Sequence, residues 1–305
     1  MNNLLSKIKE SIKRHTIFQD AVGALLLKSG FAGKFDAILI SRYKTYSQLN
    51  KKYAKYIGKN NFAPSPCPAK SKTIWVCWFQ GMDTAPWLVK TCHETVKYYC
   101  SDWEIIVIDK SNLQEYTDLP DYIIEKWQKG IISNAHFSDI VRLNLLVRYG
   151  GLWLDSTVYL TGKIPSYITD GDLFVYRNGF FEEDMINMGN WLMYSKQNNH
   201  MLNEVLNLLY KYWYNCNYTK QYFIMHIFFK MVSNKYPDEW KKVPYYNHID
   251  QHILAYEIGE KYNKTRFNQI MNLTSIHKLS NKLDLNSFHK ESIYSKLDKL
   301  YKNQD

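Results

Sequence analysis

The sequence predicts an α/β fold built around a mostly parallel sheet. Three short apolar segments, rich in β-branched and aromatic residues, alternate with segments of helical periodicity. This alternation is typical of parallel strands joined by helices. The three predicted strands are TIWVCWF at 73–79, WEIIVID at 103–109 and LWLD at 152–155. Ligands of such sheets bind at the carboxyl ends of the strands, so we expect a functional site there.

The chain before the first strand is predicted to be helical and then extended. Apolar residues recur at helical spacing near the N terminus, at Leu4, Leu5, Ile8 and Ile12. A segment with three prolines follows at 58–72. Each proline removes a backbone donor and restricts its predecessor, which favours an extended linker. We therefore expect a helical N-terminal extension with its linker over residues 1–70.

The remaining chain is predicted to form one domain over 71–290 and a short tail over 291–305. The helical segments within it are 85–100, 119–130, 134–149, 199–215 and 220–236. Beyond residue 160 the alternation of strands and helices loosens. A polar segment, SIHKLSNKLD at 275–284, precedes the tail.

The net charge of +10 draws the protein toward polyanions. The lysines are dispersed, however, and neither a zinc-finger spacing nor an RNA-binding signature is present, which argues against nucleic acid as a partner. The first 15 residues have the pattern of a short basic amphipathic helix. Two interpretations of that helix stay open: it packs on the domain, or it makes peripheral contact with an anionic membrane.

The five cysteines form no CxxC motif, and no secretory signal is recognisable. Both features are typical of free thiols in a reducing compartment, which predicts a cytoplasmic location. Association with the inner face of the membrane stays open as an alternative. No apolar stretch reaches the roughly 18 residues of a membrane span.

The stretch SDIVRLNLLVRYGGLWLDST at 138–157 carries the strongest chemical signal. Asp139 and Arg142 lie three residues apart and so share one helix face. Asp155 follows the third predicted strand directly. A carboxylate at a strand end can hold a ribose or a cation bridging a diphosphate, while the helical pair fixes the nucleoside. Alternatively, Asp139 and Arg142 form a structural ion pair and Asp155 is a turn residue.

The segment FSDIVRLNLLVRYGGLWLDSTVYL resembles the SD-x-x-R…GG-x-x-x-D-x-D region of glycosyltransferase family 32 and related sugar transferases. It is still more similar to the bacterial capsular polysaccharide synthesis proteins. Four further segments agree in the same order, so that the resemblance covers roughly residues 70–285. They are KTIWVCWFQGMDTAPWLVKTC, WEIIVIDKSNLQEYTDLPDYI, NWLMYSKQNNHMLNEVLNLLYKYW and SIHKLSNKLD.

The resemblance implies a GT-A fold, one Rossmann-like domain that binds a nucleotide sugar. It implies a hexosyltransferase that moves a sugar, from a UDP-sugar donor and with retention of configuration. The expected acceptor is a surface or capsular polysaccharide or its lipid-linked precursor. The alternative is a catalytically degenerate module of the same fold that binds a glycan or a protein partner.

The resemblance also implies roles for particular residues. Asp139 and Arg142 contact the nucleoside and sugar, and Asp155 takes the first position of the DXD motif. Arg142, Lys278 and Lys282 stabilise the leaving diphosphate, so Asp155, Arg142 and Lys282 are the expected catalytic residues. Thr157 stands at the second carboxylate position. A hydroxyl is a poorer ligand for Mn²⁺ or Mg²⁺ than a carboxylate, which puts the metal dependence in question.

His277 is the expected additional metal ligand beside Asp155 and Thr157. Because imidazole is a softer donor than carboxylate, we expect stimulation by Mn²⁺ in preference to Mg²⁺.

Five further residues are weaker candidates for the donor site. Trp78 and Gln80 close the first strand, where the nucleobase is expected, and Asp109 ends the second. Asn190 and Trp191 are candidates for the sugar pocket. The plain structural alternatives are core packing for the two tryptophans and a capped turn for Asp109.

Overall fold

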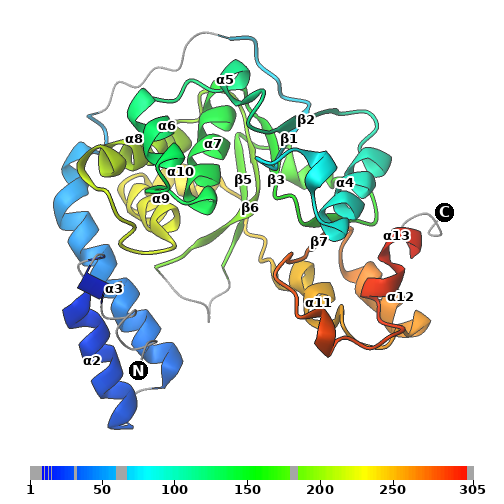
Figure 1. The fold of residues 1–305 in the computed structure, drawn as a ribbon. Coiled ribbons are helices and arrows are strands. Elements are labelled where there is room, and N and C mark those ends of the chain that lie inside the picture. The colour runs from blue at the N-terminus through cyan, green and yellow to red at the C-terminus, as the bar shows by residue number, and fades with distance from the viewer. Residues whose placement is uncertain are drawn as a thin grey trace.

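The computed structural model describes residues 16–30, 33–59, 67–178 and 185–300, together with positions 9, 11, 12 and 14. At its centre lies a five-stranded sheet in the order β2-β1-β3-β6-β5 (Figure 1). The strands are β1 (Thr73–Cys77), β2 (Glu104–Ile108), β3 (Gly151–Leu154), β5 (Leu173–Arg177) and β6 (Met188–Ser195).

Strand β1 pairs in parallel with both β2 and β3, whereas β6 runs antiparallel to β3 and to β5. All strands of this sheet except β6 therefore point the same way. The mostly parallel sheet, with helices on both faces, confirms the predicted α/β class.

Alternate side chains of the sheet enter separate hydrophobic clusters on its two faces, as the pleat of a strand requires. Trp75 of β1 and Trp153 of β3 pack into the larger cluster with α7 (Asn134–Tyr149), α8 (His200–Asn215) and α9 (Ile224–Lys235). Ile74 and Leu152 pack into the cluster on the opposite face. The helices α5 (Leu113–Tyr116), α6 (Asp121–Gln128) and α10 (Pro237–Lys242) lie on the α7 side, and α4 (Trp87–Tyr99) lies on the other (Figure 1).

The turn from α7 into β3 depends on its two glycines. Gly150 and Gly151 have φ angles of 74° and 96°, which side chains rarely tolerate. A Cβ on Gly151 would also lie 2.6 Å from the carbonyl oxygen of Thr73. The tight turn lets the chain pass from the buried helix α7 directly into the central strand β3. Residues of the helix and of the strand therefore reach the same end of the sheet.

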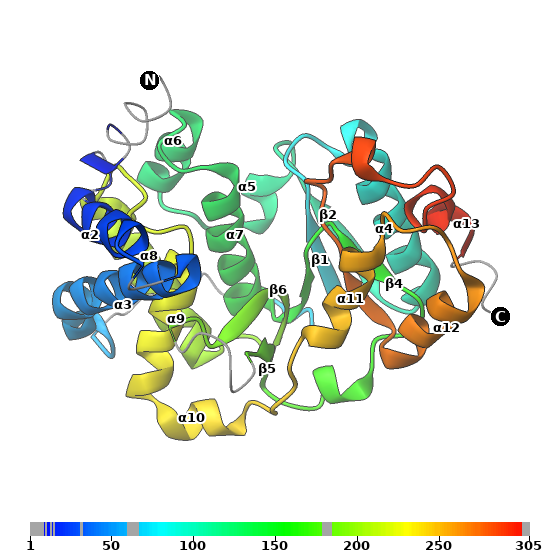
Figure 2. The same cartoon turned by 90° about the horizontal axis from the view of Figure 1, so that it is seen from below.

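The C-terminal part of the chain forms a second, smaller layer. Strands β4 (Val158–Leu160) and β7 (Ile276–Lys278) make a two-stranded sheet, flanked by α11 (Ile249–Glu257), α12 (Lys264–Leu273) and α13 (Leu297–Leu300) (Figure 2). The segment predicted as polar therefore contains a buried strand. In the region predicted as a tail from residue 291, Ile293 and Leu297 belong to a hydrophobic cluster, so the described residues of that region pack against the domain.

The N-terminal helices α2 (Ile17–Lys28) and α3 (Lys34–Tyr53) form a hairpin that projects from the body (Figures 1 and 2). The end of α3 enters the main core, where the Tyr53 ring lies 5.6 Å from that of Phe228. The extension predicted over 1–70 is therefore joined to the domain by shared packing. The basic helix predicted over the first 15 residues lies almost wholly outside the described residues.

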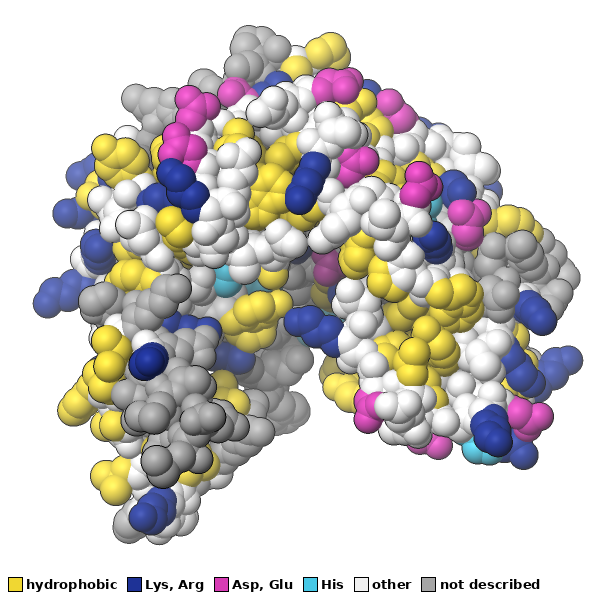
Figure 3. Space-filling model, viewed as in Figure 1, with side chains coloured by type: hydrophobic (Ala, Val, Ile, Leu, Met, Phe, Trp, Pro, Cys, Tyr) yellow, Lys and Arg dark blue, Asp and Glu magenta, His cyan; other side chains and the backbone are white. Residues whose placement is uncertain are grey.

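The surface is hollowed between the side that carries α2 and α3 and the side that carries α11 and α12 (Figure 3). Within the described part of the chain, no helix is both long enough and apolar enough to cross a membrane.

Candidate functional site

A cavity of about 540 Å³ lies at the carboxyl ends of β1 and β3, the edge at which the sequence predicts a site. Its walls come from the ends of these two strands, the first turns of α7, the first half of β6, the start of α9 and the loop after β7. The predicted residues that line it are Trp78, Gln80, Asp139, Arg142, Asp155, Thr157, Asn190, Trp191, Lys278 and Lys282.

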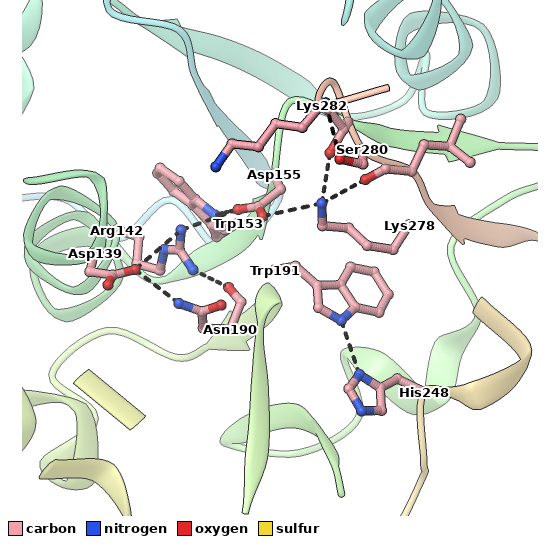
Figure 4. A network of polar contacts seen from close by, with 12 residues as sticks. Asp139, Arg142, Trp153, Asp155, Asn190, Trp191, His248, Lys278, Ser280 and Lys282 are labelled. Atoms are coloured by element: carbon pink, nitrogen blue, oxygen red, sulfur yellow. Dashed lines mark hydrogen bonds and ion pairs between the residues drawn. The ribbon is translucent and has the colours of Figure 1, made fainter. Parts of the chain in front are cut away.

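Arg142 is the centre of the polar network in this cavity (Figure 4). Its Nη2 atom lies 3.1 Å from Oδ1 of Asp155 and 3.6 Å from Oδ1 of Asp139. Its guanidinium carbon lies 4.8 Å from the centre of the Trp153 ring, and the indole Nε1 of Trp153 donates to Asp155 at 3.0 Å. Both predicted carboxylates therefore share one arginine, so the expected Asp139–Arg142 ion pair extends to Asp155.

Strand β6 supplies the next contacts, because its antiparallel pairing places Asn190 and Trp191 beside the end of β3. The Nδ2 atom of Asn190 donates to Oδ1 of Asp139 at 2.9 Å, and its carbonyl oxygen accepts from Nη1 of Arg142. The backbone amide of Asp155 donates to the carbonyl of Trp191 at 2.8 Å. The positions of Asp139, Arg142 and Asp155 are thus fixed from α7, β3 and β6 together.

Burial raises the pKa of Asp139 to about 7. The positive charge of Arg142 opposes this shift, and the negative charge of Asp155 adds to it. Burial disfavours the charged form of a carboxyl group, whereas a nearby cation favours it. Asp139 therefore holds its proton more readily than an exposed carboxyl group does.

Lys278 and Lys282 bring positive charge to the other side of Asp155. The Nζ atom of Lys278 donates to Oγ1 of Thr157 at 2.7 Å and to the carbonyl of Leu279 at 2.8 Å. The same atom lies 3.7 Å from Oδ2 of Asp155. Lys282 extends over this cluster from the loop after β7 (Figure 4). Three cationic side chains therefore surround two carboxylates, and this excess of positive side chains suits an anionic ligand.

The predicted metal ligands do not come together. His277 is fully buried on β7, where its Nε2 atom lies 3.2 Å from Oγ1 of Thr161. Neighbouring residues of a strand face opposite ways, so Lys278 faces the cavity and His277 faces away from it. Burial lowers the pKa of His277 to about 3. His277 therefore does not lie beside Asp155 and Thr157 in this structure, and its role as a metal ligand stays a prediction.

The other two expected ligands, Asp155 and Thr157, both contact the ammonium of Lys278. The hydroxyl of Thr157 accepts a hydrogen bond from the Lys278 ammonium, and this cation lies between Thr157 and Asp155. The described residues contain no group of three or more His, Cys, Asp or Glu side chains that can hold an ion. Of the three expected ligands, Asp155 is the one carboxylate, and a divalent cation held by it would take its other oxygen ligands from water and from the phosphates of a bound donor.

Asp109 lies outside the cavity. Its Oδ1 atom accepts from the backbone amide and the hydroxyl of Ser111 at 2.7 and 2.6 Å, which caps the turn after β2. These hydrogen bonds lower the pKa of Asp109. These contacts are those of a turn cap, the structural alternative for this residue, and its contact with a nucleobase stays a prediction.

Comparison with known proteins places the chain in a family. The sequence profile described as "Capsular polysaccharide synthesis protein" matches residues 34–297. The chain belongs to this family. It is also similar to the O-glycosyltransferase braB of Annulohypoxylon truncatum, with 29% identity over 98 residues, 29% of this chain and 23% of that protein. The O-glycosyltransferase PaGT of Phomopsis amygdali is 29% identical over 102 residues, 30% of this chain and 25% of that protein.

The chain spans about a quarter of the length of these curated relatives. Among solved structures, it aligns with one titled "PaToxG Glycosyltransferase" at a TM-score of 0.39 and 16% identity. That alignment covers 86% of this chain and 96% of the other.

In this family member, helix α9 and the residues before it add cavity residues that the sequence does not reveal. Tyr222, Phe223 and His226 line the wall opposite the lysines. The Nδ1 atom of His226 is buried and has no hydrogen-bond partner in the described structure, and burial lowers the pKa of this side chain to about 3. In sequence, His226 is one polar residue in an apolar helical run, which is also typical of a core histidine.

Proposed function

We propose that this protein is a glycosyltransferase that takes a UDP-sugar as donor. The observation that carries the proposal is the cluster of Arg142, Lys278 and Lys282 around Asp139 and Asp155 in one cavity. A nucleotide sugar presents a doubly charged diphosphate between two groups rich in hydroxyls, and this cluster offers the opposite charge together with carboxylate acceptors. The cavity volume lies within the range of about 300–1,000 Å³ that is usual for ligand pockets.

The nucleobase would lie toward Trp78 and Gln80. The indole Nε1 atom of Trp78 is buried without a partner in the described structure, although this residue lines the cavity. A buried donor is normally satisfied, and a carbonyl of the base can accept from it. This orientation leaves the diphosphate beside Lys278 and Lys282 and the sugar near Asp155, Asn190 and Trp191.

The reaction breaks the bond between the anomeric carbon and the diphosphate oxygen. Negative charge develops on that oxygen, and the ammonium groups of Lys278 and Lys282 stabilise it. The acceptor hydroxyl forms the new bond to the anomeric carbon and gives its proton to the departing diphosphate. Retention of configuration follows if both events occur on one face of the sugar, and no separate protein base is then required.

Lys278 would supply the positive charge that a divalent cation supplies in a site with two carboxylates. Its Nζ atom already bridges the side chains of Thr157 and Asp155, at 2.7 and 3.7 Å. The sequence leads us to expect a contribution from Mn²⁺ or Mg²⁺, and the activity in the presence of a chelator measures that contribution.

The acceptor would be an oligosaccharide or a lipid-linked glycan. A second hollow of about 370 Å³ is lined by Tyr167, Tyr176, Tyr246 and Gln251. Tyr176 stacks on Trp191 with ring centres 5.0 Å apart, so this pair separates the hollow from the donor cavity. The Oε1 atom of Gln251 is buried without a partner in the described structure. Tyrosine rings beside an unsatisfied amide suit a sugar ring.

A purified sample tests the function with a panel of nucleotide sugars. Release of UDP from at least one UDP-sugar, with the configuration of the product followed by NMR, is the expected result. Donor binding without hydrolysis or transfer across a panel of glycan acceptors would favour the alternative, a degenerate module that binds glycans or a protein. The five cysteines are free thiols, which supports a cytoplasmic location as part of the proposal.

A further inference from the structure

Nearly all of the net charge lies in the N-terminal segment. Residues 1–59 contain twelve Lys and Arg but only three Asp and Glu, a net charge of +9. The other 246 residues contain 27 basic and 26 acidic residues. The charge of the whole chain is therefore the charge of the hairpin α2–α3, with the residues immediately before and after it. We call residues 17–53 the arm.

The arm exposes large apolar side chains along its length. On α2, Phe18 and Leu25 are both 67% exposed, and on α3 Tyr43 is 64% exposed. Ile17, Leu27, Ile38 and Ile40 are exposed as well. Apolar and basic side chains are interspersed on the described part of the arm (Figure 3), and the Lys44 ammonium lies 4.5 Å from the Phe18 ring. Exposed apolar patches of this kind mark interaction surfaces.

The arm meets the body beside the donor cavity. The guanidinium of Arg42 on α3 lies 4.5 Å from the ring of Phe223, which lines that cavity. Tyr46, one turn further on, accepts a hydrogen bond from Asn234. A surface bound by the arm would therefore lie on the same side of the molecule as the wall formed by α9.

We propose that the arm docks this protein on an anionic lipid surface, with its apolar side chains among the acyl chains and its lysines at the headgroups. Interfacial helices combine these two features, and their binding strength grows with buried apolar area and with anionic lipid. At 12 residues α2 is too short to span a bilayer, and α3, which has 20 residues, is not apolar enough, so the arm lies in the interface. The inference is independent of the proposed enzymatic function, because binding to lipid is measured without turnover.

Flotation of the full chain with phosphatidylcholine vesicles, with and without phosphatidylglycerol, tests the proposal. We expect partition onto the anionic vesicles only, reduced at high salt. The double variant Leu25→Ser/Leu27→Ser should bind at least about tenfold more weakly. The matched control is Leu273→Ser/Leu285→Ser, which removes side chains of comparable exposure, 47% and 53%, from the C-terminal layer and should leave binding unchanged.

The charge is tested separately by Lys28→Glu/Lys51→Glu, with Lys264→Glu/Lys290→Glu as the control of equal net charge. Only the first pair should weaken binding, by about tenfold or more. Equal loss in both pairs would show a diffuse charge effect and overturn the proposal. Failure of the unmodified chain to float would also overturn it. In that case, a dimer by light scattering that Leu25→Ser/Leu27→Ser dissociates would identify the arm as an interface between copies.

Discussion

The ammonium of Lys278 donates to the hydroxyl of Thr157 at 2.7 Å and lies 3.7 Å from the carboxylate of Asp155. Asp155 and Thr157 are the first and last residues of the Asp-Ser-Thr sequence, which takes the place of a DXD motif in the resemblance to sugar transferases. In the proposed function, the Lys278 ammonium supplies positive charge where a site with two carboxylates would bind a metal ion.

Lys278→Ala should lower kcat by about 10²–10³-fold, because one preorganised positive group is lost from the leaving diphosphate. The wild-type protein should keep its activity within about twofold in excess chelator. Adding Thr157→Asp to Lys278→Ala should restore activity only when Mn²⁺ is present. Lys290→Ala, at an exposed lysine outside the cavity, is the control. Loss of wild-type activity in chelator would contradict the role of Lys278.

Asp155→Asn should reduce both donor turnover and stability. Arg142 is almost wholly buried, and loss of the Asp155 charge leaves it with Asp139 as its remaining carboxylate partner. Weakening of a buried ion pair and its hydrogen bonds costs roughly 1–3 kcal/mol. Urea denaturation and UDP release measure the two effects in the same sample. An unchanged kcat in this variant would show that Asp155 is not a catalytic residue.

The raised pKa of Asp139 makes the stability depend on pH in a defined direction. Its folded pKa of about 7 lies above the ordinary value of 3.8, so the folded state holds the proton over that interval. The stability associated with this group is complete below about pH 4 and is lost as the pH rises through 7. Relative to Asp139→Asn, the wild type should therefore lose unfolding free energy between pH 5 and 8, on the order of a few kcal/mol. A constant difference between the two proteins across this range would disprove the shift.

Tyr246→Ala should raise the KM for a glycan acceptor about tenfold and leave donor hydrolysis unchanged. The reason is that Tyr246 lines the second hollow, on the far side of the Trp191–Tyr176 pair from the donor. Tyr256→Ala is the matched control, since Tyr256 is 85% exposed and lies on α11 away from that hollow. Equal acceptor kinetics in the two variants would locate the acceptor elsewhere.

The sequence by itself determined three of the five strands of the central sheet, and the grouping of Asp139, Arg142 and Asp155, because both depend on local patterns. The strands β1, β2 and β3 are short apolar runs bounded by turn residues, and Asp139 and Arg142 share a helix face by spacing alone. Asp155 reaches the same site because a pair of glycines joins that helix directly to β3.

Only the tertiary structure decided which side of the later strands each residue faces. His277 and Lys278 are adjacent in sequence, and the pairing of β7 with β4 turns one into the core and the other toward the cavity. Strands β5 and β6 and the wall from α9 also form through contacts between residues distant in the chain, which no local pattern encodes. A single sequence specifies periodicity, but the register of long-range pairing sets which side chains meet.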